Sequence, residues 1–136
     1  MVKMSVDYTG DLRCVAKHGP SGSLIETDAP ADNHGKAQRF SPTDLMGAAI
    51  ATCVATTLGI AAQGKGWKLD GMRLEVVKEM GAAPPRRIVR LAVELWMPTA
   101  MASEDREQVE NIARHCPIHK SLHPDVDAPV IVHWPS

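Results

Sequence analysis

The chain is poor in aromatic residues and cysteine, and it has no marked excess of either charge. Its 136 residues include one phenylalanine, one tyrosine, three tryptophans and three cysteines, and its formal net charge at pH 7 is −1. So few aromatic rings argue against a base-stacking surface, and the scattered positive residues argue against an electrostatic nucleic-acid site. We therefore expect no nucleic-acid partner.

The sequence also offers little support for export or for a membrane span. Met1–Ser5 lead directly into a strand-like pattern, and Leu45–Ala62 is the only long uncharged stretch. That stretch is rich in alanine, threonine and glycine, which suits burial between protein surfaces better than lipid. An odd number of cysteines favours reduced thiols over a disulfide framework. We expect a cytoplasmic protein without a membrane partner.

What the sequence does contain is strand-like alternation of apolar and polar residues on both sides of one long helix. The polar segment 28–38 is predicted to be a loop, as is Gly81–Pro85. The predicted order is three strands, a helix, two strands, a helix and a strand. This order predicts an α+β fold with mainly antiparallel sheets, two principal helices and a single domain over residues 1–136. The predicted strands cover residues 4–8, 12–16, 24–27, 72–77, 89–97 and 130–134.

The long central helix has clear start and stop signals. Ser41 is a good N-cap, Pro42 suits the first helical position, and Asp44 lies where a capping box needs an acceptor. The apolar run lasts to Ala62, and the segment 64–66, Gly-Lys-Gly, is predicted to end the helix. This pattern favours a helix cap over a catalytic acid as the role of Asp44.

A second helix is predicted to begin near Ser103. Its apolar stripe, Val109, Ile112 and Ala113, continues at helical spacing to Cys116 and should direct that side chain toward the core. Pro117 then begins a short helical turn, which makes Cys116 the N-cap of that turn.

Cys53 and Cys116 are the best candidates for chemistry because each occupies a place where a thiol can be tuned. A thiolate, not a thiol, attacks peroxides and disulfides, and a free cysteine with a pKa near 8.5 is only about 3% ionised at pH 7. Cys116 would lie beside free backbone N–H groups. Cys53 lies well inside its helix and would need a cation from elsewhere in the fold. If the fold brings the two together, they can cycle between dithiol and disulfide.

Structural interpretations of these residues remain open. A free cysteine is usually a small core residue. This structural role is an alternative for Cys53 and for Cys116, and it is the favoured role for Cys14. Three arginines, Arg86, Arg87 and Arg90, fit a solvated edge.

The segment around Cys116 also has some features of a metal site. Cys116 and His119 are spaced like a ligand pair, and histidines recur at His115, His119 and His123. Pro117 interrupts a continuous helix there and no second ligand pair is present, so we predict no metal.

Several of these residues together resemble the OsmC/Ohr family of thiol peroxidases. The similar segments are Ser41–Leu45, Ala48-Ala49 followed by Cys53, and Cys116–Leu122 with the sequence CPIHKSL. The resemblance implies an intertwined homodimer with active sites at the subunit interface, which reduces organic hydroperoxides without a bound cofactor.

The resemblance also implies different chemical roles for the two cysteines. The residue matching Cys53 is the peroxidatic cysteine, which becomes a sulfenic acid. The residue matching Cys116 then condenses with it to a disulfide, and an external dithiol, commonly lipoyl-linked, restores the pair.

The sequence departs from the peroxidase pattern at the residues that activate the first cysteine. In those enzymes an upstream arginine stabilises the thiolate and a glutamate after the helix-opening proline holds the arginine. Here Thr43 occupies the glutamate position, Asp44 follows it, and Arg39 is the nearest upstream arginine. We therefore predict Arg39 and Asp44 as catalytic partners of the cysteines, and the alternative is an OsmC-like redox sensor or small-molecule or thiol-binding protein with weak or no peroxidase activity. The predicted substrate-contacting residues are Thr43, Thr57 and His119.

Overall fold

The computed structural model describes all 136 residues, and the chain forms two compact units, Met1–Leu45 and Met46–Ser136. Both units combine strands with helical segments, and the predicted α+β class with mainly antiparallel pairing is confirmed. The single domain predicted over residues 1–136 stays a prediction.

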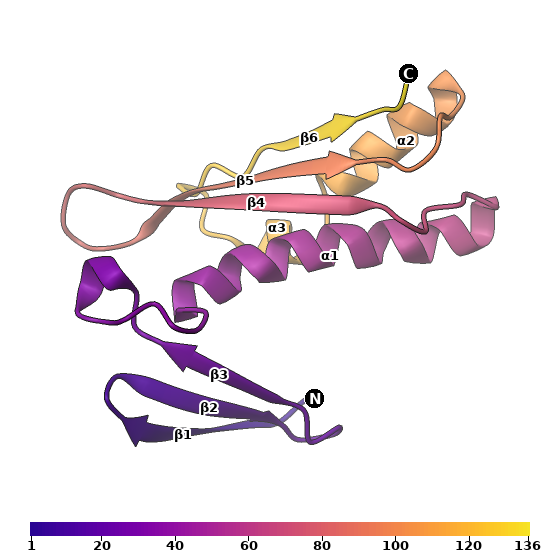
Figure 1. Cartoon of the computed structure of the whole chain (residues 1–136). Coiled ribbons are helices and arrows are strands. Elements are labelled where there is room, and N and C mark those ends of the chain that lie inside the picture. The colour runs from indigo at the N-terminus through magenta and orange to yellow at the C-terminus, as the bar shows by residue number, and fades with distance from the viewer. The chain divides into compact units, whose positions relative to one another are not determined.

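The first unit is built on an antiparallel sheet with the strand order β1-β2-β3 (Figure 1). A two-residue turn joins β1 to β2, and both of its residues, Asp11 and Leu12, have positive φ angles of 54° and 64°. This is the backbone twist that a tight hairpin requires. The three predicted strands are confirmed as β1 (Met4–Gly10), β2 (Arg13–His18) and β3 (Leu24–Asp28).

The predicted loop after β3 wraps around a buried carboxylate. Asp28 is almost fully buried, and its Oδ2 accepts a hydrogen bond from the backbone N–H of Gln38 at 3.0 Å. That bond, helped by the nearby Arg13 guanidinium, holds the pKa of Asp28 below its usual value although burial acts in the opposite direction. The loop also contains a short 3₁₀ turn, η1 (Ala31–Asn33), which the sequence analysis did not predict.

The second unit has a mixed sheet with the order β4-β5-β6, in which β4 pairs antiparallel and β6 parallel to β5. The parallel pairing follows from the long connection between β5 and β6, which contains α2 and α3 (Figure 1). The strands are β4 (Arg73–Met80), β5 (Ile88–Trp96) and β6 (Val130–His133), and the helices are α1 (Pro42–Lys65), α2 (Ser103–Ala113) and α3 (Pro117–Ser121).

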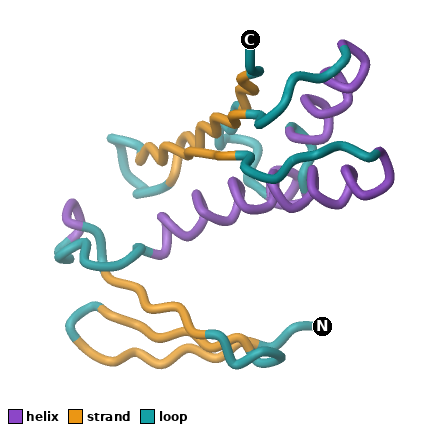
Figure 2. Tube along the Cα trace, turned by 45° about the vertical axis from the view of Figure 1, so that its right-hand side comes forward, coloured by secondary structure: helices purple, strands orange, loops and turns teal.

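α1 is one unbroken helix (Figure 2). It buries a single stripe of side chains. Gly47 at the start of that stripe brings the helix close to Val76 and Leu91 of the sheet. The rest of the core comes from the inner face of the sheet and from α2. By length and composition alone α1 could cross a membrane, but a core helix meets the same criterion, so this is weak support for a span. The buried stripe consists of Gly47, Ile50, Val54, Leu58 and Ala62.

The predicted capping box at the start of α1 is confirmed. The backbone N–H of Ser41 donates to Asp44 Oδ2 at 2.9 Å, and the N–H of Asp44 donates back to Ser41 Oγ at 3.0 Å. The helix ends slightly later than predicted, since it includes Gly64 and Lys65 and stops where Gly66 adopts a φ of +68°.

The second predicted helix ends earlier than its apolar spacing indicates. α2 ends at Ala113, so Cys116 does not belong to its stripe. Cys116 is instead the N-cap of the next helix, α3, and its side chain is buried in the core, as predicted.

Replacing the buried cap should destabilise the protein measurably. We expect Ser41→Ala to lower the free energy of unfolding by about 1 kcal/mol, because the N–H of Asp44 loses its acceptor. Urea unfolding at fixed protein concentration measures the change. Ser103→Ala is the matched control, because Ser103 begins α2 without acting as its cap; equal losses in the two variants would contradict the prediction.

Candidate functional site

The second unit brings the two predicted cysteines into direct interaction. Cys116 belongs to the buried core cluster, and Cys53 packs against that cluster from α1. Both are free thiols, and a side-chain hydrogen bond with Cys53 acts on the ionisation of Cys116. The Cys53 Sγ also lies 3.9 Å from Thr57 Oγ1, one helical turn further along α1. The fold therefore provides a pair of neighbouring thiols from segments far apart in the sequence.

The two thiols differ in their access to solvent. Cys53 is half-buried, whereas Cys116 is 0% exposed. A reagent from solvent can therefore meet Cys53 first.

Cys116 is held in its protonated form by its surroundings. Burial raises the pKa of Cys116 above its ordinary value, and the neighbouring Cys53 thiol raises it further. The backbone N–H of His119 donates to Cys116 Sγ at 3.4 Å and acts in the opposite direction without cancelling the effect of burial. Capping of α3 by this sulfur was predicted, but the accompanying helix terminus does not make it a thiolate.

His119 fixes the position of α3 through its ring. Its Nε2 lies 3.0 Å from the backbone oxygen of Ala128, just before β6. Because a carbonyl oxygen can only accept, Nε2 carries the proton of this bond. One residue thus ties the start of α3 to the sulfur through its backbone and to the β6 segment through its side chain. The predicted contact between His119 and substrate stays a prediction.

The other two histidines of the recurring set make local bonds. His115 Nδ1 lies 2.6 Å from the backbone oxygen of Asn111, and His123 Nδ1 accepts from the N–H of Asp125 at 3.1 Å. No group of three or more side chains of the ligating types gathers into a metal site.

The predicted arginine lies in the first unit and is already paired. Arg39 Nε donates to Glu26 Oε2 at 3.1 Å, and Nη1 donates to the backbone oxygen of Gln38 at 2.8 Å. Asp44 and Thr43 lie at the start of α1, next to the Ser41 hydroxyl. Ser41 Oγ accepts from the Asp44 N–H at 3.0 Å and lies 3.1 Å from Thr43 Oγ1. The catalytic roles of Arg39 and Asp44 stay predictions.

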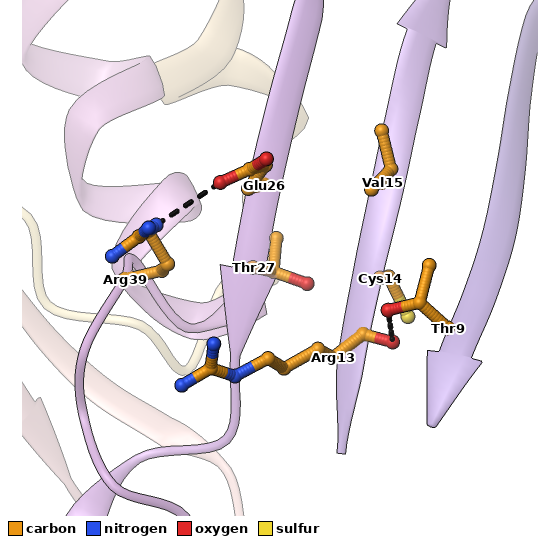
Figure 3. Close-up of a pocket in the computed structure, with 7 residues that line it drawn as sticks. All are labelled: Thr9, Arg13, Cys14, Val15, Glu26, Thr27 and Arg39. Carbon is orange, nitrogen blue, oxygen red and sulfur yellow. Dashed lines mark hydrogen bonds and ion pairs between the residues drawn. The ribbon is translucent and has the colours of Figure 1, made fainter. Parts of the chain in front are cut away.

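Sequence reasoning missed a hollow of about 340 Å³ in the first unit (Figure 3). Arg13, on β2, and Arg39, which follows β3, both line it. The pairing of Val15 with Glu26 puts these two residues on the same face of the sheet as Arg13. Only the register between β2 and β3 reveals this grouping, and no local pattern in the sequence specifies that register. The full lining is Thr9, Arg13, Cys14, Val15, Glu26, Thr27 and Arg39.

Comparison with known proteins gives one family and a consistent set of folds. The family model described as OsmC-like protein matches residues 34–129. A solved structure from Psychrobacter arcticus 273-4, of a protein named for an osmotic stress induced and detoxification response, is 39% identical over 98% of this chain and 96% of that chain, with a TM-score of 0.92.

Two more distant structures share the fold. The organic hydroperoxide resistance protein OsmC of Legionella pneumophila is 14% identical, covers 97% of this chain and 96% of that chain, and has a TM-score of 0.76. The organic hydroperoxide resistance protein OhrB of Bacillus subtilis is 15% identical, covers 98% of each chain, and has a TM-score of 0.71. No curated protein sequence matches the chain.

The raised pKa of Cys116 predicts a loss of stability at alkaline pH. The folded chain keeps the Cys116 proton at pH values where the unfolded chain has lost it, so the free energy of unfolding should fall as pH rises above about 8.5. Urea unfolding of reduced protein between about pH 7 and pH 10 measures this slope.

Two variants separate this effect from other alkaline titrations. Cys116→Ser should flatten the slope, whereas Cys14→Ser, which leaves Cys116 in place, should keep it. The same slope in both variants would show that Cys116 does not cause the loss.

Proposed function

The chain belongs to the OsmC-like protein family, and on that premise we propose that it is a cysteine-based thiol peroxidase that reduces organic hydroperoxides. The observation that carries the proposal is the contact between two free thiols of unequal access, Cys53 and Cys116. Redox or peroxide-resistance roles in the names of structural relatives add support.

The first step uses the more accessible thiol. The Cys53 thiolate attacks the terminal peroxide oxygen, the O–O bond breaks, and the alkoxide takes up a proton to leave as an alcohol. Sulfur loses two electrons and becomes a sulfenic acid. Cys116 does not compete for peroxide in this step, because it is buried and its raised pKa keeps it protonated.

The second step joins the two sulfurs. Cys116 sulfur attacks the Cys53 sulfenic sulfur, the S–O bond breaks, and the leaving hydroxide combines with the Cys116 proton to form water. An external dithiol, for which a lipoyl-linked carrier is the expected class, then reduces the disulfide by two thiol–disulfide exchanges. No bound cofactor takes part in this scheme.

Other residues have supporting roles in the proposal. Arg39 would stabilise the Cys53 thiolate by its charge, and Asp44 would orient Arg39. Thr43, Thr57 and His119 would contact the substrate, and the position of Thr57 beside the Cys53 sulfur supports its part.

We also propose that the protein acts as a cytoplasmic homodimer with its active sites at the subunit interface. α1 leaves Met46 and Ile60 on its outer side 42% and 66% exposed, and β1 exposes Met4, Val6 and Tyr8. So much exposed apolar surface on regular elements favours an interaction between copies of the chain.

Cysteine variants test the proposed chemistry. With a dithiol present, we expect the wild-type protein to consume cumene hydroperoxide and Cys53→Ser to lose that activity. Cys116→Ser should retain the first turnover, seen as one equivalent of alcohol per subunit, but fail to cycle. Cys14→Ser is the control and should cycle normally. A wild-type protein that consumes no hydroperoxide with any dithiol donor would refute the proposal.

A second function is favoured by the residues around the predicted arginine. Arg39 is engaged by Glu26 and Gln38, and Thr43 replaces the glutamate of the peroxidase pattern. An OsmC-like redox sensor or a small-molecule or thiol-binding protein would retain the thiol pair without a strongly activated thiolate.

The pH dependence of Cys53 alkylation distinguishes the two functions. A midpoint of iodoacetamide labelling below about pH 6.5 is the result expected of a peroxidase. A midpoint near about pH 8.5, as for an ordinary thiol, would favour the sensor or binding protein. Labelling is measured by mass spectrometry in Cys14→Ser, so that the third thiol, which is half-buried like Cys53, does not contribute.

A further inference from the structure

We propose that His119 is a positioning residue, which holds the Cys116 sulfur where it can attack the Cys53 sulfur. The inference deepens the proposed function and rests on it, because the step concerned is the disulfide-forming step of that scheme. His119 makes two bonds in different directions. Its backbone N–H donates to Cys116 Sγ at 3.4 Å, and its ring Nε2 donates to the Ala128 oxygen at 3.0 Å. A reacting atom is thus linked to the segment before β6.

α3 needs such a bond because the helix cannot hold its own position. It has five residues and no fully buried side chain. A helix of this length closes too few internal hydrogen bonds to be stable by itself. Ile118, within it, and Leu122, directly after it, pack against the core but remain partly exposed. The ring bond of His119 adds a directional contact to this partial packing.

The acceptor of the ring bond lies in a segment that is fixed to the sheet on both sides. Before Ala128, the Asp127 oxygen accepts from the N–H of Leu91 at 2.8 Å. After it, the Pro129 oxygen accepts from the N–H of Val93 at 2.9 Å. Both donors belong to β5, the central strand of the sheet. The ring bond therefore fixes α3, and with it the sulfur, relative to that strand.

Positioning of Cys116 matters most for the second step of the proposed chemistry. The rate of a reaction between two groups of one chain falls when their reacting geometry is populated less often. His119 is half-buried, so loss of its ring would leave the Ala128 carbonyl without a donor in a partly shielded place. We therefore expect His119 to act on disulfide formation and not on the attack of Cys53 on peroxide.

A direct contact between His119 and the hydroperoxide would have the opposite kinetic signature. It would change the rate at which Cys53 attacks the peroxide, whereas positioning of Cys116 leaves that rate unchanged. The step that a His119 variant affects therefore separates the two roles.

Thiol–disulfide equilibria test the inference without any hydroperoxide. In Cys14→Ser protein, the fraction of Cys53–Cys116 disulfide in buffers of reduced and oxidised glutathione gives the effective concentration of one thiol toward the other. His119→Leu, which lacks the ring donor, should lower this effective concentration by about fivefold, the scale of one lost hydrogen bond. His119→Gln, whose amide can donate to Ala128, should restore most of it.

His115→Leu is the matched control. The His115 ring also lies against a backbone oxygen, at 2.6 Å, but that oxygen belongs to Asn111 of α2. This variant should leave the effective concentration unchanged. Equal losses in His115→Leu and His119→Leu, no loss in folded His119→Leu, or no recovery in folded His119→Gln would each overturn the inference.

Single-turnover kinetics separate a failure of this inference from a failure of the proposed function. If the wild-type protein reduces no hydroperoxide, the glutathione equilibrium still reports on His119. If it does, His119→Leu should release alcohol at the wild-type rate and form the disulfide about fivefold more slowly. Slower alcohol release with an unchanged equilibrium would assign His119 to the substrate instead.

The ring itself provides a measurement that needs no variant. Nitrogen-15 chemical shifts of His119 in the reduced wild-type protein should show the neutral ring protonated at Nε2 and not at Nδ1, because only that tautomer donates to Ala128. The opposite tautomer would overturn the inference even if every His119 variant failed to fold.

Discussion

The contact between an accessible thiol on α1 and a buried thiol at the start of α3 is the constraint on which the candidate chemistry depends. It exists because α1 buries one stripe of side chains in the core and Cys116, at the start of α3, is buried in the same core. Burial keeps the pKa of Cys116 high, so the two sulfurs are chemically unequal before any substrate arrives. Such an asymmetry suits a pair in which one thiol meets the oxidant and the other follows.

His119 links Cys116, its near neighbour in the sequence, to a segment further along the chain. Its backbone bonds to the Cys116 sulfur, whereas its ring bonds to Ala128 beyond α3. A short helix of five residues has little stability of its own, so these tertiary bonds hold it in place. The geometry of the thiol pair thus depends on the segment that leads into β6 as well as on α1.

Local signals in the sequence were enough to predict much of this fold. Ser41 and Asp44 form their capping box within four residues, and strand alternation needs only neighbouring side chains. The predicted end of α2 was wrong. Helical spacing alone extends the apolar stripe to Cys116, although the helix ends at Ala113. The contact between Cys53 and Cys116 is implied only by the family resemblance. No local sequence pattern specifies a contact between residues so far apart in the chain.

The grouping of Arg13, Gln38 and Arg39 was beyond sequence reasoning for a different reason. It requires the register of β2 against β3 and the path of the loop around Asp28, both of which are tertiary properties. Alternation assigns Arg13 to a face of its strand but does not say what lies opposite.

The buried Asp28 has a consequence for acid conditions. Its carboxylate accepts the Gln38 N–H as an anion, and its pKa is lowered in the folded chain, so this stabilisation is present above the ordinary aspartate pKa and is lost as pH falls through the lowered one. Acid would therefore release the loop of the first unit, while alkali acts on the thiol core of the second. The two halves of the molecule respond to opposite ends of the pH scale, and neutrality is the range that both tolerate.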